Sequence, residues 1–495
     1  MRACPAIVVP AATLWFALAA PAQQPVEAPR IESPFGSVQR LHAPPDSPEP
    51  KYTLWVDYPR DGGYFLDHVQ YLADLQRRFS EHGIAVTAVM PMTVAKRVVA
   101  RSTSFTVAAS ADAEPPLMEG LGADAPPPGA MAVLCRDGAS DPVASSALDG
   151  AVDLLQAIAD DKLESPALQP MEEAVEGLLA GVIDSGELAA EVQRCVAAWP
   201  RSGRVRAMAV LYQWWSKGDL EAAHKAFEEG VKALAGEAVP MVQFADLVLR
   251  GDRHDPRHAK TLAVLLGPLA AASPDGVFTQ LVYLRALLRA GQDRIAGRTA
   301  AMLRKHLDDR WWDQLVFAET LMEANTPAAF RDAAEQAIQA ASVVDLNGLG
   351  GHGNPDIPNT RWLCAVRHKV LVRCGDLEAA EKLMVEYRGK NENAFGLNND
   401  AWYMMVQPGS LGRFDTFALA QCEEMQRQQG AGMSNGNKDT VALALFLNGK
   451  VQEAVELQTV AAAASGHDSR YVGRLTRFEA VLTGQAKTKG ADAKK

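Results

Sequence analysis

The chain has 495 residues, more than a single hydrophobic core organises, so we expect two or more domains. Apolar residues make up 48% and charged residues 22%, a composition typical of folded domains rather than of disordered chains. The formal net charge of −11 disfavours nucleic acid or an anionic membrane as the main partner, because both require a basic face.

Residues 1–22 have the pattern of an export signal. Arg2 provides a positive start, residues 6–20 form an apolar run, and Ala20 and Ala22 are the small residues that precede a cleavage site. A run of this length is short for a membrane span, which needs about 20 residues. We therefore expect cleavage before Gln23 and a periplasmic or extracellular protein with no integral span after cleavage. The alternative is an uncleaved anchor.

Residues 23–50 contain seven prolines. Proline cannot donate a backbone hydrogen bond, and such stretches are usually extended linkers. We expect a disordered tether here.

Residues 51–165 change to an alternating pattern of strands and helices. Strands are expected at residues 52–57, 84–89 and 131–135, with helices at residues 65–82 and 147–159. Strand, helix and strand, followed later by a strand, a turn and a helix, predict a small α/β layer fold.

This region resembles the bacterial periplasmic thioredoxin-like proteins. The segments "EHGIAV" at 81–86 and "AVLCRDG" at 132–138 stand where that family has its second strand of the first βαβ unit and a later strand with its turn. The family's redox C-x-x-C then falls on Gly62 to Phe65, so both cysteines are absent, and its cis-proline position falls near Pro128 or Gly129. The resemblance implies the fold without the redox chemistry; another small α/β fold is the alternative.

Residues 166–483 read as almost continuous helix with short breaks. Glycine ends a helix well because it adopts a left-handed turn, and a small alanine lets the next helix cross closely. Spacings of 37 residues from Gly375 to Gly412 and from Gly412 to Gly449 indicate a repeat of stacked helix pairs. Four glycines are each followed by alanine five residues later: Gly218 and Ala223, Gly291 and Ala296, Gly375 and Ala380, Gly449 and Ala454.

These segments resemble tetratricopeptide repeats, most clearly at residues 210–231 and 439–458. We therefore expect a multidomain protein: an α/β thioredoxin-like N-terminal domain followed by an all-α, tetratricopeptide-like helical solenoid. Residues 484–495 are rich in lysine and read as a disordered basic tail.

The sequence contains no convincing catalytic, metal or cofactor site. Its six cysteines include no C-x-x-C pair, and Cys135 lies in an expected strand, where burial is the simpler role. His254 and His258 are four residues apart, but Pro256 lies between them and no H-E-x-x-H follows, so a solvated helix start is expected. The glycine-rich stretch at 348–353 lacks a phosphate-binding motif and is expected to be a connector.

The remaining candidate for function is the concave face of the solenoid. In tetratricopeptide proteins the first helix of each pair lines that face. Aromatic and guanidinium groups there could hold an extended acidic peptide; the alternative is that Trp215 belongs to the core and the arginines are solvated. Carried over from that family, the groove residues are Tyr212, Trp215, Arg285, Arg289 and Arg373.

We expect a non-enzymatic interaction or scaffold protein of the cell envelope that binds a protein or peptide partner. The alternatives are a thiol–disulfide oxidoreductase or peroxiredoxin-like enzyme that uses a lone cysteine such as Cys135, and a purely structural envelope protein.

Overall fold

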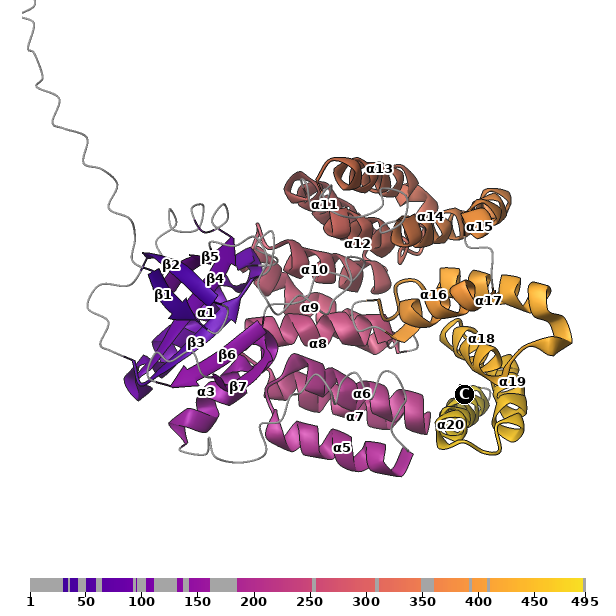
Figure 1. Cartoon of the computed structure of the whole chain (residues 1–495), viewed down its shortest axis with the longest axis horizontal. Coiled ribbons are helices and arrows are strands. Elements are labelled where there is room, and N and C mark those ends of the chain that lie inside the picture. Colours follow the sequence, from indigo (N-terminus) through magenta and orange to yellow (C-terminus); the bar gives the residue numbers. More distant parts are fainter. Residues whose placement is uncertain are drawn as a thin grey trace, which may run out of the picture.

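The computed structural model has a small mixed sheet at one end and a large helical region beside it (Figure 1). This confirms, in coarse form, the expected α/β region followed by a helical one. None of the described helices is long and apolar enough to cross a membrane. The structure describes residues 30–33, 36–42, 50–58, 65–91, 95, 104–110, 131–136, 142–160, 185–251, 255–307, 311–348, 360–390, 394–406 and 410–492.

The described sheet has seven strands in the order β1-β2-β5-β4-β3-β6-β7. Strand β4 pairs in parallel with both β3 and β5, and the other pairings are antiparallel. The strands are β1 (Arg30–Ser33), β2 (Gly36–His42), β3 (Tyr52–Asp57), β4 (Ile84–Pro91), β5 (Thr106–Ser110), β6 (Met131–Arg136) and β7 (Pro142–Ala147).

The centre of the sheet has the connectivity that the sequence predicts. Strand β3 leads through helix α1 (Phe65–Phe79) to its parallel neighbour β4, and the antiparallel pair β6–β7 leads to helix α3 (Ala151–Ala159). Leu54 on β3, Val86 on β4 and Leu134 on β6 are fully buried, as expected for a sheet packed against helices. The arrangement is compatible with a thioredoxin-like fold.

Four strands lie outside that prediction. Residues 30–33 and 36–42, expected in the tether, form β1 and β2, and β2 pairs with β5. The strands β5 and β7 were not expected, because alanine and serine give them little β-propensity. The helix expected from Ala147 begins at Ala151, after the short 3₁₀ turn η3 (Leu148–Gly150).

The helical region consists of consecutive helix pairs. In each of the first four pairs the first helix packs against the first helix of the next, so α6, α8, α10, α12 and α14 lie in succession. The helices are α5 (Ser185–Ala198), α6 (Gly203–Lys217), α7 (Leu220–Ala233), α8 (Ala238–Gly251), α9 (Pro256–Ala272), α10 (Val277–Arg289), α11 (Asp293–Leu303), α12 (Trp311–Leu321), α13 (Arg331–Gly348), α14 (Thr360–Arg373), α15 (Leu377–Lys390), α16 (Ala394–Val406), α17 (Asp415–Gln429), α18 (Asn435–Leu447), α19 (Val451–Ala464) and α20 (Ser469–Asp492).

The four repeated glycines end helices as the pattern requires. Gly218, Gly291, Gly375 and Gly449 all have positive φ, between 61° and 82°. The alanine that follows each of them by five residues is at most 3% exposed, so each sits at a tight helix crossing. The stretch from 232 to 360, where the repeat is hard to follow in the sequence, holds three further pairs, α8–α9, α10–α11 and α12–α13.

The two ends of the helical region meet. Helix α20 packs against α6, and the approach is close enough that a Cβ added to Gly484 would lie 1.9 Å from the Gly218 carbonyl oxygen. One hydrophobic core therefore runs from Ala207 on α6 to Val481 on α20. Residues 484–492, expected in a disordered tail, belong to α20.

Carboxylates of the sheet region cap two helices of the helical region. Asp67 on α1 accepts hydrogen bonds from the backbone amides of Phe278 (3.3 Å) and Thr279 (2.7 Å), at the start of α10. Asp149 in η3 accepts from the Arg204 amide at 3.0 Å, at the start of α6. Helix N-termini attract negative charge, so these carboxylates stabilise α10 and α6 and fix the position of the sheet region against them.

Candidate functional site

A network of buried charges fills the inner side of the helical region. Arg285 on α10 reaches Asp246 on α8 at 3.1 Å and contacts Glu319 on α12. Lys369 on α14 lies 2.5 Å from Glu319, and Arg413 lies 3.2 Å from the same carboxylate. All five side chains are at most 5% exposed. The network therefore connects four successive inner helices to the segment before α17.

Neighbouring cations lower the pKa of both buried carboxyl groups, those of Asp246 and Glu319. Burial alone would raise the pKa of Asp246, but the guanidinium groups of Arg250, Arg413 and Arg285 outweigh it and lower that pKa to about 2. The pKa of Glu319 is lowered in the same way by Arg285, Lys369 and Arg413. Burial, together with the neighbouring arginines, lowers the pKa of Arg413 to about 10. Asp246, Glu319 and Arg413 are therefore ionised at neutral pH.

Arg413 reaches the network because its segment inserts against α8. Arg250 donates a hydrogen bond to the Leu411 carbonyl oxygen at 2.8 Å. Gly412 has φ of +69°, and a Cβ there would lie 2.3 Å from the Arg250 carbonyl oxygen, so only glycine fits. The segment before α17 thus packs directly against the C-terminal end of α8.

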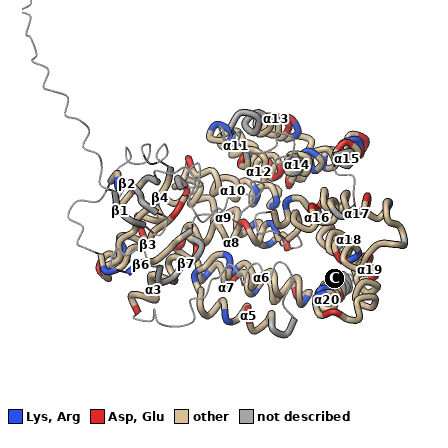
Figure 2. The backbone as a smooth tube through the Cα atoms, viewed as in Figure 1, with Lys and Arg blue, Asp and Glu red and all other residues tan. Residues whose placement is uncertain are grey.

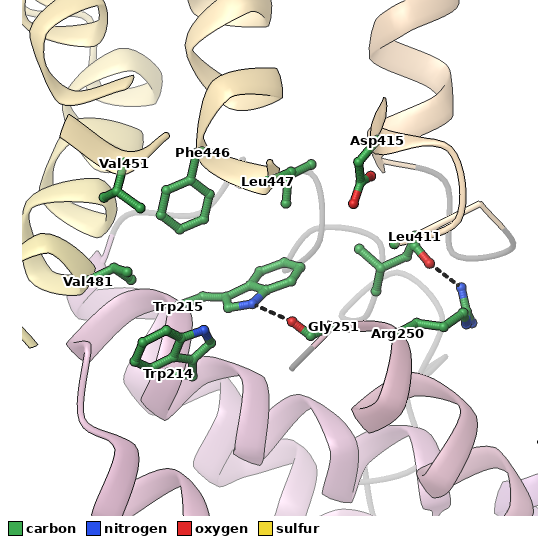
Figure 3. A pocket seen from close by; sticks show the side chains of 11 residues that line it. Trp214, Trp215, Arg250, Gly251, Leu411, Asp415, Phe446, Leu447, Val451 and Val481 are labelled. Carbon is green, nitrogen blue, oxygen red and sulfur yellow. Dashed lines mark hydrogen bonds between the residues drawn. The ribbon is translucent and has the colours of Figure 1, made fainter. Parts of the chain in front are cut away.

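Beside this insertion a pocket remains open (Figure 3). Its volume is about 430 Å³, counting the solvent at its mouth, and its lining comes from both ends of the helical region. The Trp215 indole donates a hydrogen bond to the Gly251 carbonyl oxygen at 3.1 Å, which fixes the ring at the pocket wall. Polar and apolar atoms contribute about equally to its exposed wall; the lining residues are Trp214, Trp215, Arg250, Gly251, Leu411, Gly412, Asp415, Phe446, Leu447, Val451 and Val481.

Of the five residues expected in a groove, only Trp215 lines this pocket. Arg285 belongs to the buried network, and Tyr212 is 6% exposed in a core with Trp199. Arg289 donates to the Leu249 carbonyl oxygen, and Arg373 donates to the carbonyl oxygens of Met322 and Ala324. Both arginines thus hold the C-terminal end of a preceding inner helix, a role that helix-end carbonyls favour.

A second pocket, of about 500 Å³, lies between the sheet region and helices α8 to α10. His68 and Tyr71 on α1 line it. Burial lowers the pKa of His68 to about 3, so the imidazole is neutral. The Tyr71 hydroxyl has no hydrogen-bond partner among the described residues.

The described cysteines are not arranged for thiol chemistry. Cys135 and Cys422 are fully buried, and no disulfide is formed among the described residues. Burial raises the pKa of Cys195 to about 11 and raises that of Cys374. A nucleophilic thiol requires a lowered pKa and access to substrate. Gly62, aligned with the first redox cysteine, lies outside the described residues, as do Pro128, Gly129 and residues 1–29.

Within the described part of the chain, one group of side chains could hold a metal ion: His224, Asp255 and His258. His254 and His258 were expected at a solvated helix start. That expectation is wrong for His258, which is 1% exposed, and His254 lies outside the described residues. His224 was missed because it is 34 residues from His258 and on a different helix. A repeat register could have found it, since α7 and α9 hold equivalent positions in consecutive pairs.

Figure 2 shows that positive and negative residues are mixed along the helices and do not separate into faces of one sign. No protein-family model matches the chain, and no curated protein matches it in sequence. The site must therefore be interpreted from its own geometry.

Proposed function

We propose that the protein is a non-enzymatic interaction protein, in which a tetratricopeptide-like helical array and a redox-inactive thioredoxin-like module form one scaffold. The observation that supports this best is the pocket beside Trp215. Its walls come from α6 at one end of the helical region and from α18 to α20 at the other, so it depends on the whole array. A pocket that only a complete fold assembles suits specific recognition.

The chemistry of the pocket indicates its partner. Phe446, Leu447 and Val481 contribute apolar surface around the fixed Trp215 ring. Arg250 and Asp415 stand at one side. We infer a protein or peptide partner that anchors one large apolar side chain there, as aromatic-lined pockets commonly do.

A peptide-display selection on the purified full chain tests this. We expect enriched peptides to share one large apolar residue and to lose binding at least tenfold on Leu447→Arg, which places a charge in the pocket wall. Val460→Arg is the matched control, since Val460 is 51% exposed on α19 and is not among the pocket-lining residues. Absence of enrichment, or peptides that bind all three proteins equally, would contradict the proposal and favour a purely structural protein.

The alternative of a lone-cysteine enzyme makes a separate prediction. Cys135 is fully buried in β6 and packs with Trp55 and Val89, so substrate has no access to it. We expect no insulin reduction above background from the wild type. Turnover by the wild type that disappears in Cys135→Ser would replace the scaffold proposal with an oxidoreductase.

We also propose export to the periplasm or the extracellular space, on the basis of residues 1–22. N-terminal sequencing of protein recovered from that compartment should begin at Gln23. Recovery of Met1 would overturn this part of the proposal without affecting the pocket.

A further inference from the structure

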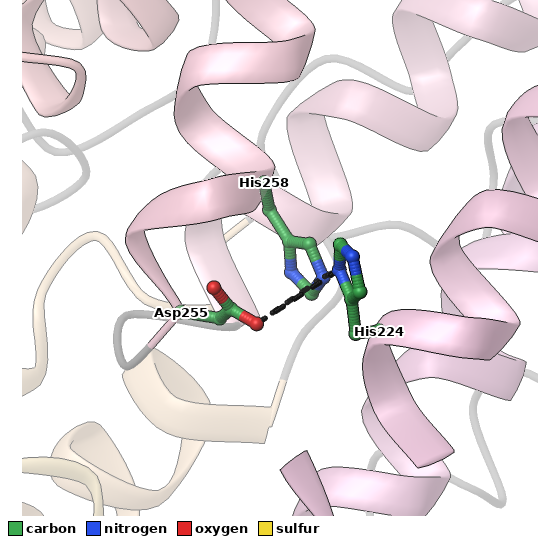
Figure 4. Close-up of side chains that lie close together, drawn as sticks. All are labelled: His224, Asp255 and His258. Carbon is green, nitrogen blue, oxygen red and sulfur yellow. Dashed lines mark hydrogen bonds and ion pairs between the residues drawn. The ribbon is translucent and has the colours of Figure 1, made fainter. Parts of the chain in front are cut away.

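Three potential metal ligands meet between two consecutive outer helices (Figure 4). His224 is on α7, Asp255 is the residue immediately before α9, and His258 is on the first turn of α9. His224 Nδ1 lies 3.2 Å from His258 Nε2. The nearer Asp255 carboxylate oxygen is 4.0 Å from His224 Nδ1 and 3.7 Å from His258 Nε2.

These separations are close to those around one small cation. Ligand atoms on a tetrahedral ion with bonds of about 2.1 Å lie roughly 3.4 Å apart. The three separations here are 3.2, 3.7 and 4.0 Å, so ligation requires the Asp255 oxygen to move closer to both imidazoles. The two imidazole rings are 5.3 Å apart between centroids. Two imidazoles on one tetrahedral ion would be separated by roughly 5 Å, so the rings need little movement.

The surroundings hold these groups in place. His258 is 1% exposed and stacks on Phe227, with ring centroids 4.1 Å apart. Asp255 caps α9 through the Arg257 amide, and the Arg257 guanidinium also binds its carboxylate at 2.7 Å. Glu228 approaches the other nitrogen of His224, Nε2, at 3.6 Å. A carboxylate on the outer nitrogen orients a ligating imidazole and strengthens it.

We propose that His224, Asp255 and His258 bind one divalent transition-metal ion of the zinc class, which bridges α7 and α9. Two imidazoles and one carboxylate favour zinc over magnesium or calcium, which prefer oxygen ligands. The His224 side chain is 21% exposed, so a fourth position remains open to water at the surface. The ion would join two consecutive helix pairs, independently of the Trp215 pocket.

The competing explanation is a metal-free arrangement. In it one imidazole donates a hydrogen bond to the other, and Arg257 alone neutralises Asp255. Zinc titration of the tag-free, chelator-treated full chain separates the two, with a chromogenic chelator as competitor. We expect one zinc per chain in the wild type. The affinity for zinc should fall at least tenfold in His224→Gln, because the substitution removes a ligating imidazole. His224 is partly exposed, so the substitution does not disturb the core.

Two further variants make the result specific. His306→Gln is the matched control, because His306 is an exposed histidine 3.8 Å from a single carboxylate, that of Asp275. It should bind zinc like the wild type. Glu228→Gln should weaken binding less than His224→Gln does, because the Glu228 carboxylate lies 3.6 Å from His224 Nε2, outside hydrogen-bond distance. Circular dichroism of the metal-free variants should match the wild type, which separates loss of a ligand from loss of fold.

Cobalt in place of zinc identifies the ligands. We expect the visible absorption of a tetrahedral site without a sulfur-to-metal charge-transfer band, and its loss in His224→Gln. A charge-transfer band would place the ion on cysteine and overturn the proposal. No stoichiometric zinc in the wild type, or unchanged affinity in His224→Gln, would also overturn it, as would binding of ferrous iron in preference to zinc.

Discussion

Two buried aspartates, one in the helical interior and one where the sheet region meets the helices, show opposite responses to burial. Asp246 is 3% exposed and Asp153 is 7% exposed. The pKa of Asp246 is lowered to about 2, because three arginines outweigh the cost of burial. Burial raises the pKa of Asp153 to about 7, since the Arg201 amide only partly offsets it and Asp149 and Glu237 add negative charge nearby. The counter-charge, and not the depth of burial, decides the protonation state.

The comparison assigns different roles to the two regions. In the interior network, neighbouring cations lower the pKa of both Asp246 and Glu319, so these carboxylates stay ionised near neutral pH. The junction depends on carboxylates that accept backbone hydrogen bonds, and one of them titrates near neutrality. Removal of one charged partner in the interior should therefore lower the free energy of unfolding. The contribution of the junction to that free energy should instead depend on pH.

The largest expected loss of stability follows substitution of Glu319. Glu319→Gln keeps the shape but removes the charge that faces Arg285, Lys369 and Arg413. The three buried cations are then left with only Asp246 and Glu323 as partners. Loss of one partner in such a network costs about 3–5 kcal/mol of unfolding free energy. Urea denaturation measures it. The control Glu335→Gln, at a half-exposed pair with Arg331, should cost less than about 1 kcal/mol; equal effects would mean that the interior network is not essential.

A substitution that changes packing but not charge in the helical region serves as a reference for the effect of Glu319→Gln. Ala380 is 3% exposed where α15 crosses its neighbours, so Ala380→Leu should overpack the crossing and cost about 1–3 kcal/mol. Ala379, one position along, is partly exposed, and Ala379→Leu should be milder. Hydrogen exchange should show the loss of protection near α14–α17 and none in the sheet. A similar loss from both variants would contradict the assigned packing.

The stability that Asp153 contributes at the junction of the two regions should depend on pH. The folded-state pKa of Asp153, about 7, is above the unfolded value of about 4, so its stabilising contribution is present below pH 4 and is lost as pH rises to 7. Asp153→Asn keeps an acceptor for the Arg201 amide without the charge. It should match the wild type near pH 4 and exceed it by at least about 1 kcal/mol at pH 8. Denaturation curves at several pH values test this; a constant difference would refute the assigned titration.

The smallest expected effect has the opposite sign. The Tyr71 hydroxyl is buried without a hydrogen-bond partner among the described residues, so Tyr71→Phe should leave stability unchanged or raise it by up to about 1 kcal/mol. Tyr387→Phe is the contrast, because the Tyr387 hydroxyl donates to Asp400 at 2.5 Å. That variant should lose stability. Destabilisation by Tyr71→Phe would mean that the hydroxyl contributes to the junction.

The features that could be predicted from the sequence are those with local causes. The helix ends at Gly218 and Gly375 follow from the left-handed turn that glycine permits, and the buried Ala223 and Ala380 follow from the helix crossing. The central strands of the sheet follow from their apolar runs. Strands β1 and β2 could not be predicted, because their order depends on pairing with β5 about 70 residues away.

The sites could not be predicted for the same reason. Arg413 meets Glu319 across 94 residues, and His224 meets His258 across 34. Helical periodicity places a side chain on a face but does not say which distant segment covers that face. The expected groove residue Arg285 lies on α10, and Arg413 from a distant segment shares its carboxylate partners Asp246 and Glu319.

The packing of α20 against α6 has a consequence for how this architecture can change. An open stack of helix pairs can gain or lose a pair at either end, because each pair touches only its neighbours. Here the last helix is also a neighbour of the first full pair, through the contact of Gly484 with Gly218. Insertion of one pair would displace α20 and break the core at both ends at once. The number of pairs is therefore a property of the whole fold, and such a protein is expected to diversify at its surfaces and not in its length.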